Sequence, residues 1–241
     1  SVDRDLRHLC DLLQQAAVRP VLLLAPEHGF DAAAQDMAAV GGEPAGRGGV
    51  PLVSLYGDRP EQLVPGPDEL AAIDVLLVDL VDVGARYYTY AATLCMALET
   101  AAVTGTRVVV FARPNPLGGE VVEGNALAPF WRSFVGYIDV PQRHGLTVAE
   151  IARLYVAEQG LDVDLEVVAC TGWDPAAYFD EQDWGPGGTT WYAPSPNMPT
   201  VATAVVYPGG CLVEGTRLSE GRGTTRPFEI IGAPHLHARR F

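Results

Sequence analysis

The sequence predicts an α/β protein built on a doubly wound, mostly parallel sheet with helices on both faces. Three runs, at residues 21–25, 75–80 and 108–111, are almost continuously apolar and rich in Val and Leu. Such runs are typical of strands buried on both faces of a parallel sheet, and not of half-solvated antiparallel strands. The second run leads directly into a stretch with helical spacing at residues 87–103. We therefore expect these three strands to be parallel neighbours.

The first half of the chain alternates strands and helices. Apolar residues at helical spacing predict an amphipathic helix over residues 2–17, ahead of the first strand. A long Gly- and Ala-rich loop follows at 31–50, a length that is uncommon unless the loop is functional or mobile. Next come a short strand at 52–55, a short helix at 68–72, the strand at 75–80 and its helix. Gly105 is expected to end that helix before the strand that begins at residue 107.

The second half carries weaker signals. A strand is expected at 137–140, and Thr147 with Glu150 forms a capping box that begins a helix ending at Gly160. Another strand is expected at 164–170, and the Trp-, Tyr-, Pro- and Gly-rich residues 172–199 are expected to be irregular. A last apolar helix is expected from Thr200 to residue 207, ended by the Pro-Gly pair that follows.

Composition excludes several classes of partner. The 241 residues carry a net charge of −14, and all 16 basic residues are arginine. An acidic chain without a basic run argues against nucleic acid and against an anionic membrane surface. No segment resembles a transmembrane helix. The four cysteines are far apart and have no zinc-type spacing, so we expect thiols and no metal site.

Polar residues follow each of the three predicted strands. Glu27 and His28 follow the first, Asp82 and Arg86 the second, and Arg113 and Asn115 the third. Because ligands of open α/β sheets bind at the carboxyl ends of the strands, these residues are expected to converge on one edge. Glycine-rich phosphate loops, a dinucleotide fingerprint and a G-x-S-x-G elbow are all missing from the sequence. Carboxylates, arginines and aromatic residues together suit a sugar ligand.

Five motifs resemble those of the exo-β-N-acetylmuramidases of the NamZ type. They occur in order across nearly the whole chain, at residues 27–30, 82–90, 113–119, 194–200 and 207–229. The resemblance implies a Rossmann-like domain followed by a smaller C-terminal domain, with the active site between them. On this basis residues 1–232 are expected to form the catalytic domain, and residues 233–241 the start or remnant of the second domain. The implied activity is release of terminal N-acetylmuramic acid from the non-reducing end of peptidoglycan fragments, without a cofactor, in an extracytoplasmic or secreted location.

The candidate site residues follow from both lines of reasoning. Glu27 is the expected general acid/base, because it lies at a strand end beside His28, where burial can raise its pKa. His28 is a candidate catalytic residue as well. Asp82 and Glu220 are the alternatives for a second carboxylate, and the 2-acetamido group of the sugar is an alternative to a protein nucleophile. Arg86 and Arg222 are expected either to hold the lactyl carboxylate or to form ion pairs with Asp82 or Glu220. The remaining candidates for substrate binding are Tyr90, Arg113, Asn115 and Asn197.

Three departures from the family pattern keep a second hypothesis open. Val81, Asp31-Ala32 and Arg217 stand where the family usually has other residues. The alternative is therefore a non-catalytic homologue that binds peptidoglycan sugars. A nucleotide-dependent enzyme is a third possibility, resting on fold analogy alone. Glycines 221 and 223 are expected to let the backbone pass close to a sugar, with Glu220 and Arg222 facing the same cleft as Glu27 and Arg86.

Overall fold

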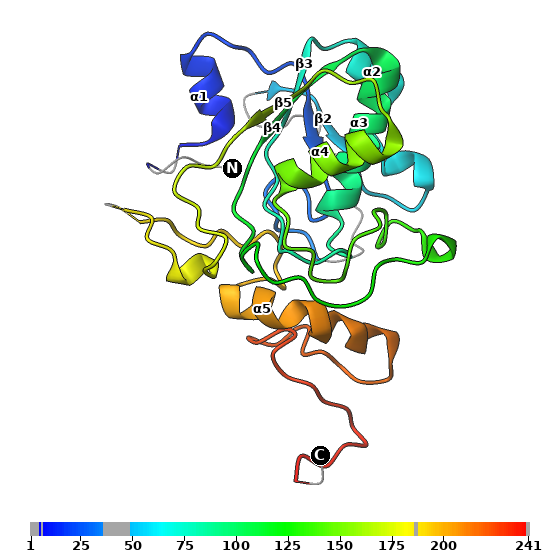
Figure 1. The fold of residues 1–241 in the computed structure, drawn as a ribbon, viewed down its shortest axis with the longest axis vertical. Coiled ribbons are helices and arrows are strands. Elements are labelled where there is room, and N and C mark those ends of the chain that lie inside the picture. The colour runs from blue at the N-terminus through cyan, green and yellow to red at the C-terminus, as the bar shows by residue number, and fades with distance from the viewer. Residues whose placement is uncertain (1–4, 6, 36–48, 186–187, 240–241) are drawn as a thin grey trace.

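The computed structural model describes residues 5, 7–35, 49–185 and 188–239 of the chain, and it shows an α/β fold (Figure 1). Five strands form the sheets: β1 (Leu23–Ala25), β2 (Leu52–Ser54), β3 (Val75–Val78), β4 (Arg107–Phe111) and β5 (Leu165–Val168). The α-helices are α1 (Leu9–Gln15), α2 (Pro67–Ala71), α3 (Tyr90–Thr104), α4 (Val148–Gln159) and α5 (Val201–Gly210). Short 3₁₀ turns lie at Pro60–Gln62, Pro129–Trp131, Phe179–Glu181 and Cys211–Gly215.

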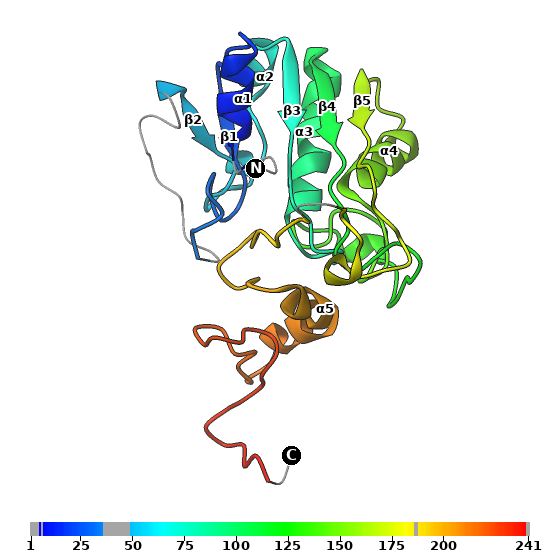
Figure 2. The same cartoon turned by 90° about the vertical axis from the view of Figure 1, so that its left-hand side faces the viewer.

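Among the described residues all the strand pairs are parallel, as the apolar runs predict. β4 is the middle strand of a three-stranded sheet, with β3 on one side and β5 on the other. One part of the prediction is wrong: β1 pairs with β2 and not with β3. Figure 2 shows β1 and β3 side by side, but a cavity of about 670 Å³ is lined by residues of both. The two sheets therefore lie side by side, and no ladder of hydrogen bonds joins β1 to β3.

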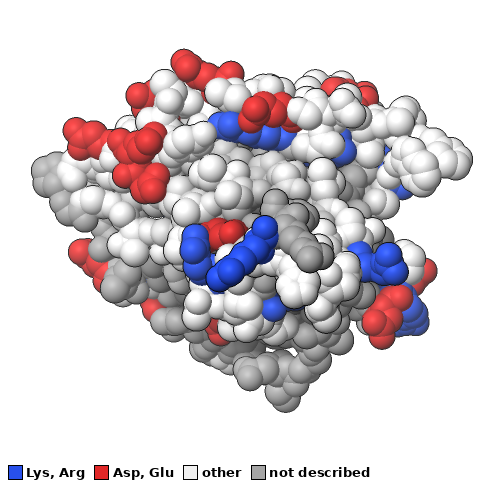
Figure 3. Space-filling view, turned by 90° about the horizontal axis from the view of Figure 1, so that it is seen from below, with Lys and Arg blue, Asp and Glu red and all other residues white. Residues whose placement is uncertain are grey.

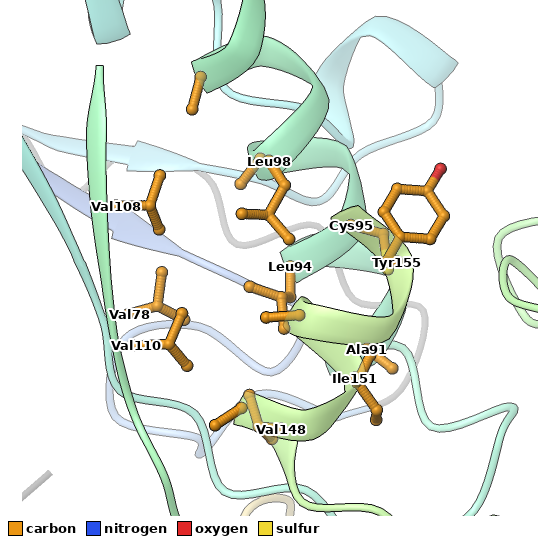
Figure 4. Packing of buried hydrophobic residues seen from close by; sticks show 14 of the residues in the cluster. Val78, Ala91, Leu94, Cys95, Leu98, Val108, Val110, Val148, Ile151 and Tyr155 are labelled. Carbon is orange, nitrogen blue, oxygen red and sulfur yellow. The ribbon is translucent and has the colours of Figure 1, made fainter. Parts of the chain in front are cut away.

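The hydrophobic core lies between the three-stranded sheet and helices α3 and α4 (Figure 4). Leu94 and Leu98 of α3 face Val108 and Val110 of β4, and Ile151 of α4 closes the cluster. α3 is apolar on most of its circumference, which is why it is the central helix. Helix α1 lies on the opposite side of the sheet, as Figures 1 and 2 show, so both faces carry helices.

Local signals set the ends of the two core helices as expected. The Thr147 hydroxyl accepts a hydrogen bond from the Glu150 amide at 3.2 Å, and the Glu150 carboxylate accepts one from the Thr147 amide at 2.7 Å. Gly160 ends α4 with φ +62°, and Gly105 ends α3 with φ +73°. Both glycines adopt the left-handed conformation that a C-terminal cap requires.

Three expected elements differ in the structure. Residues 137–140 form no strand; Ile138 and Val140 are apolar because they pack into the core, not because they pair with a neighbour. Helix α5 does not end at Pro208 but continues to Gly210, where the carbonyl of Pro208 accepts a hydrogen bond from the Tyr87 hydroxyl. Helix α1 begins at Leu9, later than expected. Most of the expected long loop, residues 36–48, lies outside the described residues.

Candidate active site

The segments that follow β1, β3 and β4 run to the same side of the fold, between the sheets and helix α5 (Figure 2). The segment from Asp82 to Tyr90 lies at the centre of this region, and it leads from β3 into α3. Its neighbours are the turn after β1, the loop after β4 and the strand-like residues 142–144. This arrangement brings together several of the polar residues that follow the strands.

Glu27 is a buried carboxylate at this edge. The residue is only 6% exposed, and its Oε2 accepts a hydrogen bond of 2.7 Å from the Thr89 hydroxyl. Thr89 immediately precedes α3, so the segment that begins with Asp82 ends on Glu27. The hydroxyl and the carboxylate are 62 residues apart in sequence, and only the fold brings them together.

His28, next to Glu27, shapes the turn after β1. Its backbone has φ +71°, which is uncommon for a residue with a side chain and marks a constrained turn. Its ring Nδ1 lies 3.0 Å from the carbonyl oxygen of Ala34, and its ring centroid lies 6.3 Å from that of Tyr88. His28 therefore fixes the loop that carries Glu27, and its catalytic role stays a prediction.

Asp82 is also buried, and it faces a histidine. Its residue is 2% exposed, its Oδ2 accepts a hydrogen bond of 2.7 Å from the Gly84 amide, and the same oxygen lies 3.4 Å from His144 Nε2. The ion pair between Asp82 and Arg86, one of the two alternatives for this arginine, is not formed. Arg86 instead donates from Nη1 to the carbonyl oxygens of Asn125 and Val140, at 2.8 and 2.6 Å.

Arg113 and Asn115 are occupied by contacts within the protein. The Arg113 guanidinium forms a two-point ion pair with Asp79, at 2.6 and 2.8 Å, and this pair raises the pKa of Arg113. Asn115 is 1% exposed; its Oδ1 accepts from the Leu117 amide at 2.9 Å and its Nδ2 donates to the Leu146 carbonyl at 3.0 Å. In the structure both side chains hold the loop after β4 in place.

Tyr90 and Asn197 join the irregular segment before α5 to the site. The Tyr90 hydroxyl donates to the carbonyl of Pro194 at 2.9 Å, and Asn197 Nδ2 donates to Gln35 Oε1 at 3.2 Å. Burial raises the pKa of Tyr90, and the nearby carboxylates of Glu27 and Asp82 act in the same direction. Tyr90 is thus a neutral phenol close to both carboxylates.

The C-terminal segment packs onto the segment 82–90 through aromatic rings. Tyr207 of α5 lies 5.7 Å from Tyr87 and 6.1 Å from Tyr88, and Phe228 lies 4.8 Å from Tyr207. The Arg222 guanidinium lies 5.7 Å from the centre of the Phe228 ring. One aromatic cluster therefore joins the segment after β3 to the C-terminal segment.

Arg222 pairs with Glu220 at 2.9 Å and with Glu214 at 3.0 Å, and not with Asp82. This is one of the ion-pair alternatives that the sequence leaves open. Figure 3 shows arginines and carboxylates interspersed on the face nearest the C-terminal segment. Whether Glu220 and Arg222 face the same cleft as Glu27 stays a prediction.

The glycines of this segment have a different role from the expected one. Gly221 has φ +89°, and a Cβ atom there would lie 2.7 Å from Ile230 Cγ1 and 3.0 Å from the Arg226 carbonyl oxygen. Gly223 has φ +80° with nothing within 4 Å of a Cβ atom. Turn geometry and close packing against the protein's own chain therefore account for these glycines without a sugar.

His144 and Thr89 are the site residues that sequence reasoning misses. A single histidine within Gln142-Arg143-His144-Gly145 has no spacing that indicates a ligand set or a catalytic pair. Across the described ranges, no group of three or more His, Cys, Asp or Glu side chains could hold a metal ion. Within the same ranges no helix is long and apolar enough to span a bilayer.

The fold and these buried groups define an α/β protein with a carboxylate-containing site at the carboxyl edge of parallel strands. The chain belongs to the family described as exo-beta-N-acetylmuramidase NamZ. The model of the family's N-terminal domain matches residues 1–202, and the model of its C-terminal domain matches residues 205–241.

Three known proteins illustrate the relationship. The peptidoglycan beta-N-acetylmuramidase NamZ of Bacillus subtilis (strain 168) is 42% identical over 236 residues, which is 98% of this chain and 55% of that protein. A crystal structure of a DUF1343 family protein from Bacteroides fragilis is 34% identical with a TM-score of 0.84, covering 99% of this chain and 59% of that one. A second from the same organism is 30% identical with a TM-score of 0.74, covering 96% and 59%. The chain thus spans little more than half the length of these relatives.

Proposed function

We propose that this chain carries the catalytic residues of an exo-β-N-acetylmuramidase, a glycosidase that releases terminal N-acetylmuramic acid from the non-reducing end of peptidoglycan fragments. The observation that carries the proposal is the pair of buried carboxylates, Glu27 and Asp82. Asp82 begins the segment 82–90, and Thr89 of the same segment is hydrogen-bonded to Glu27. Glycosidases use such carboxylates around the scissile bond. Membership of the family and the name of the Bacillus subtilis relative support the same substrate class.

In this proposal Glu27 is the general acid/base. It donates a proton to the leaving glycosidic oxygen and later takes one from water. The Thr89 hydroxyl fixes the orientation of the carboxyl group by donating to Oε2 at 2.7 Å. Asp82 is the second carboxylate in preference to Glu220, because Glu220 is paired with Arg222. The proposed place of action is outside the cytoplasm, where peptidoglycan lies.

Hydrolysis of a chromogenic aryl β-N-acetylmuramide by the full chain tests the proposal. Glu27→Gln is expected to lower kcat by about 10²–10⁴-fold, because a glutamine cannot exchange the proton. The fold is expected to survive, since the glutamine oxygen still accepts from the Thr89 hydroxyl. Glu158→Gln, at an exposed position of α4, is the matched control and is expected to keep full activity. Near-normal turnover by Glu27→Gln would remove Glu27 from the mechanism.

The same assay separates the proposal from a non-catalytic sugar-binding protein. Such a protein would bind N-acetylmuramic acid in a calorimeter but release no chromophore from the glycoside. Recognition of the lactyl group by Arg222 also stays a prediction. If Arg222→Ala keeps the wild-type preference for N-acetylmuramic acid over N-acetylglucosamine, Arg222 does not read the lactyl carboxylate.

A further inference from the structure

The two oxygens of Asp82 have different surroundings. Oδ2 accepts a hydrogen bond from the Gly84 amide at 2.7 Å and lies 3.4 Å from His144 Nε2. Oδ1 is buried and has no hydrogen-bond partner among the described residues. An unsatisfied buried carboxylate oxygen is costly, so this atom needs a hydrogen-bond donor that the described residues do not supply.

His144 can present its proton to Asp82 in only one way. Its ring is fully buried, and its Nδ1 accepts a hydrogen bond of 3.0 Å from the Leu146 amide. A neutral imidazole has one acceptor and one donor nitrogen, so the proton must lie on Nε2, the nitrogen nearest Asp82. The distance of 3.4 Å is slightly beyond the usual limit of about 3.2 Å. Hydrogen bonds of catalytic groups commonly tighten when substrate binds.

The backbone around the pair holds both side chains. Residues 84–86 run antiparallel beside residues 142–144: the His144 amide donates to the Gly84 carbonyl at 3.3 Å, and the Arg86 amide donates to the Gln142 carbonyl at 2.9 Å. Asn115 Oδ1 would lie 2.4 Å from a Cβ atom at Gly84, so this turn is tightly enclosed. Asp82 and His144 are therefore fixed relative to one another.

The pair also lies near Glu27. Tyr90 is close enough to both Asp82 and Glu27 for each carboxylate to act on its pKa. Tyr88, whose ring lies 4.9 Å from that of Tyr90, is affected by Asp82 as well. Asp82 therefore lies within electrostatic range of both tyrosines, and Glu27 within range of Tyr90.

We propose that Asp82 Oδ1 accepts a hydrogen bond from the N–H of the substrate's 2-acetamido group, and that His144 is the positioning residue that holds Asp82 through Oδ2. The proposal rests on the proposed function. When the acetamido oxygen bonds to C1 and the glycosidic C1–O bond breaks, the leaving oxygen takes the proton of Glu27. The acetamido nitrogen becomes positively charged, and the Asp82 carboxylate stabilises that charge.

In the second half of the reaction water bonds to C1 and gives a proton to Glu27, while the bond from C1 to the acetamido oxygen breaks. The acetamido group and Glu27 return to their starting forms. Throughout, Asp82 keeps its charge and His144 keeps its proton on Nε2. The sequence of steps needs no further reactant beyond water.

Two substitutions of His144 distinguish positioning of Asp82 from support of the neighbouring turn. In His144→Gln the side-chain amide can still donate near the place of Nε2. In His144→Asn the side-chain oxygen can still accept from the Leu146 amide, but the donor to Asp82 is lost. We expect kcat on the aryl N-acetylmuramide to fall about 10- to 100-fold in His144→Asn, with KM little changed, because a hydrogen bond to a charged group is lost. His144→Gln is expected to stay within about threefold of wild type. Equal losses in both variants, or better activity in His144→Asn, would overturn the proposal.

A binding experiment tests the acetamido contact independently of turnover. Calorimetry compares N-acetylmuramic acid with the analogue in which a hydroxyl replaces the acetamido group. Wild type is expected to prefer the acetamido sugar at least tenfold, and Asp82→Ala to lose the preference, as a buried acceptor contributes about that much. An unchanged preference in Asp82→Ala, or none in wild type, would overturn the assignment of Oδ1. Wild type that hydrolyses the glycoside while His144→Asn keeps full kcat would refute this inference alone. Wild type that binds but never hydrolyses would refute the proposed function.

Discussion

Gly84→Ala is expected to destabilise the protein. Gly84 has φ +79°, and an alanine in left-handed backbone costs about 1–2 kcal/mol. Its new Cβ atom would also lie 2.4 Å from Asn115 Oδ1. Asn115 cannot move aside without losing its bonds to the Leu117 amide and the Leu146 carbonyl. Each bond is worth about 0.5–1.5 kcal/mol, so the total cost is about 2–5 kcal/mol.

Gly105→Ala is the matched control for this prediction. Gly105 has φ +73°, nearly the same backbone, but a Cβ atom there would meet nothing within 4 Å. Only the backbone cost of about 1–2 kcal/mol applies to it. For a chain of this size, 1 kcal/mol lowers the melting temperature by about 2–4 °C. Thermal unfolding followed by circular dichroism is therefore expected to place Gly84→Ala about 2–12 °C below Gly105→Ala.

The two glycine variants also differ in their expected activity. The segment from Asp82 to Gly84 carries the proposed second carboxylate, so Gly84→Ala is expected to lower kcat while Gly105→Ala leaves it unchanged. Equal melting temperatures for the two variants would show that Asn115 yields without cost. The account of a rigid turn between Asp82 and the loop after β4 would then be refuted.

Three further predictions concern single contacts. Thr89→Val removes the hydroxyl that donates to Glu27, and is expected to lower kcat by about tenfold or more in the chromogenic assay. An unchanged kcat would show that this hydrogen bond does not contribute to catalysis. Thr147→Ala removes the capping box formed with Glu150, and is expected to lower stability by about 1 kcal/mol in urea unfolding; no shift in the midpoint would contradict the cap. Burial raises the pKa of the Cys211 thiol to about 12, so iodoacetamide at pH 8 is expected to label it slowly in the native protein and rapidly in urea, as read by mass spectrometry. Fast labelling of the native protein would show that the thiol is exposed.

Elements with local signals can be predicted from the amino-acid sequence alone. Residues 75–80 and 107–111 are apolar enough to be recognised as buried parallel strands, and β3 and β4 do pair in that way. The capping box at Thr147 and the glycine after Thr104 set the ends of α4 and α3. The family motifs likewise placed the chain in its family. For the strands and the helix ends, neighbouring residues alone carry the information, because the backbone conformation and burial of a run depend on its own composition.

Contacts between residues far apart in the sequence depend on the folded chain as a whole. The apolar residues of a strand do not indicate which strand it pairs with. In this structure β1 pairs with β2, and a cavity lies between β1 and β3. In the same way, the charge of Arg113 shows only that it needs an anion, and the fold supplies Asp79. His144 carried no signal in the sequence, because its importance depends on Asp82, 62 residues earlier, and on the Leu146 amide that orients its ring. Partner choice depends on loop closure and on the packing of the whole core, and these are properties of the folded chain and not of any local pattern.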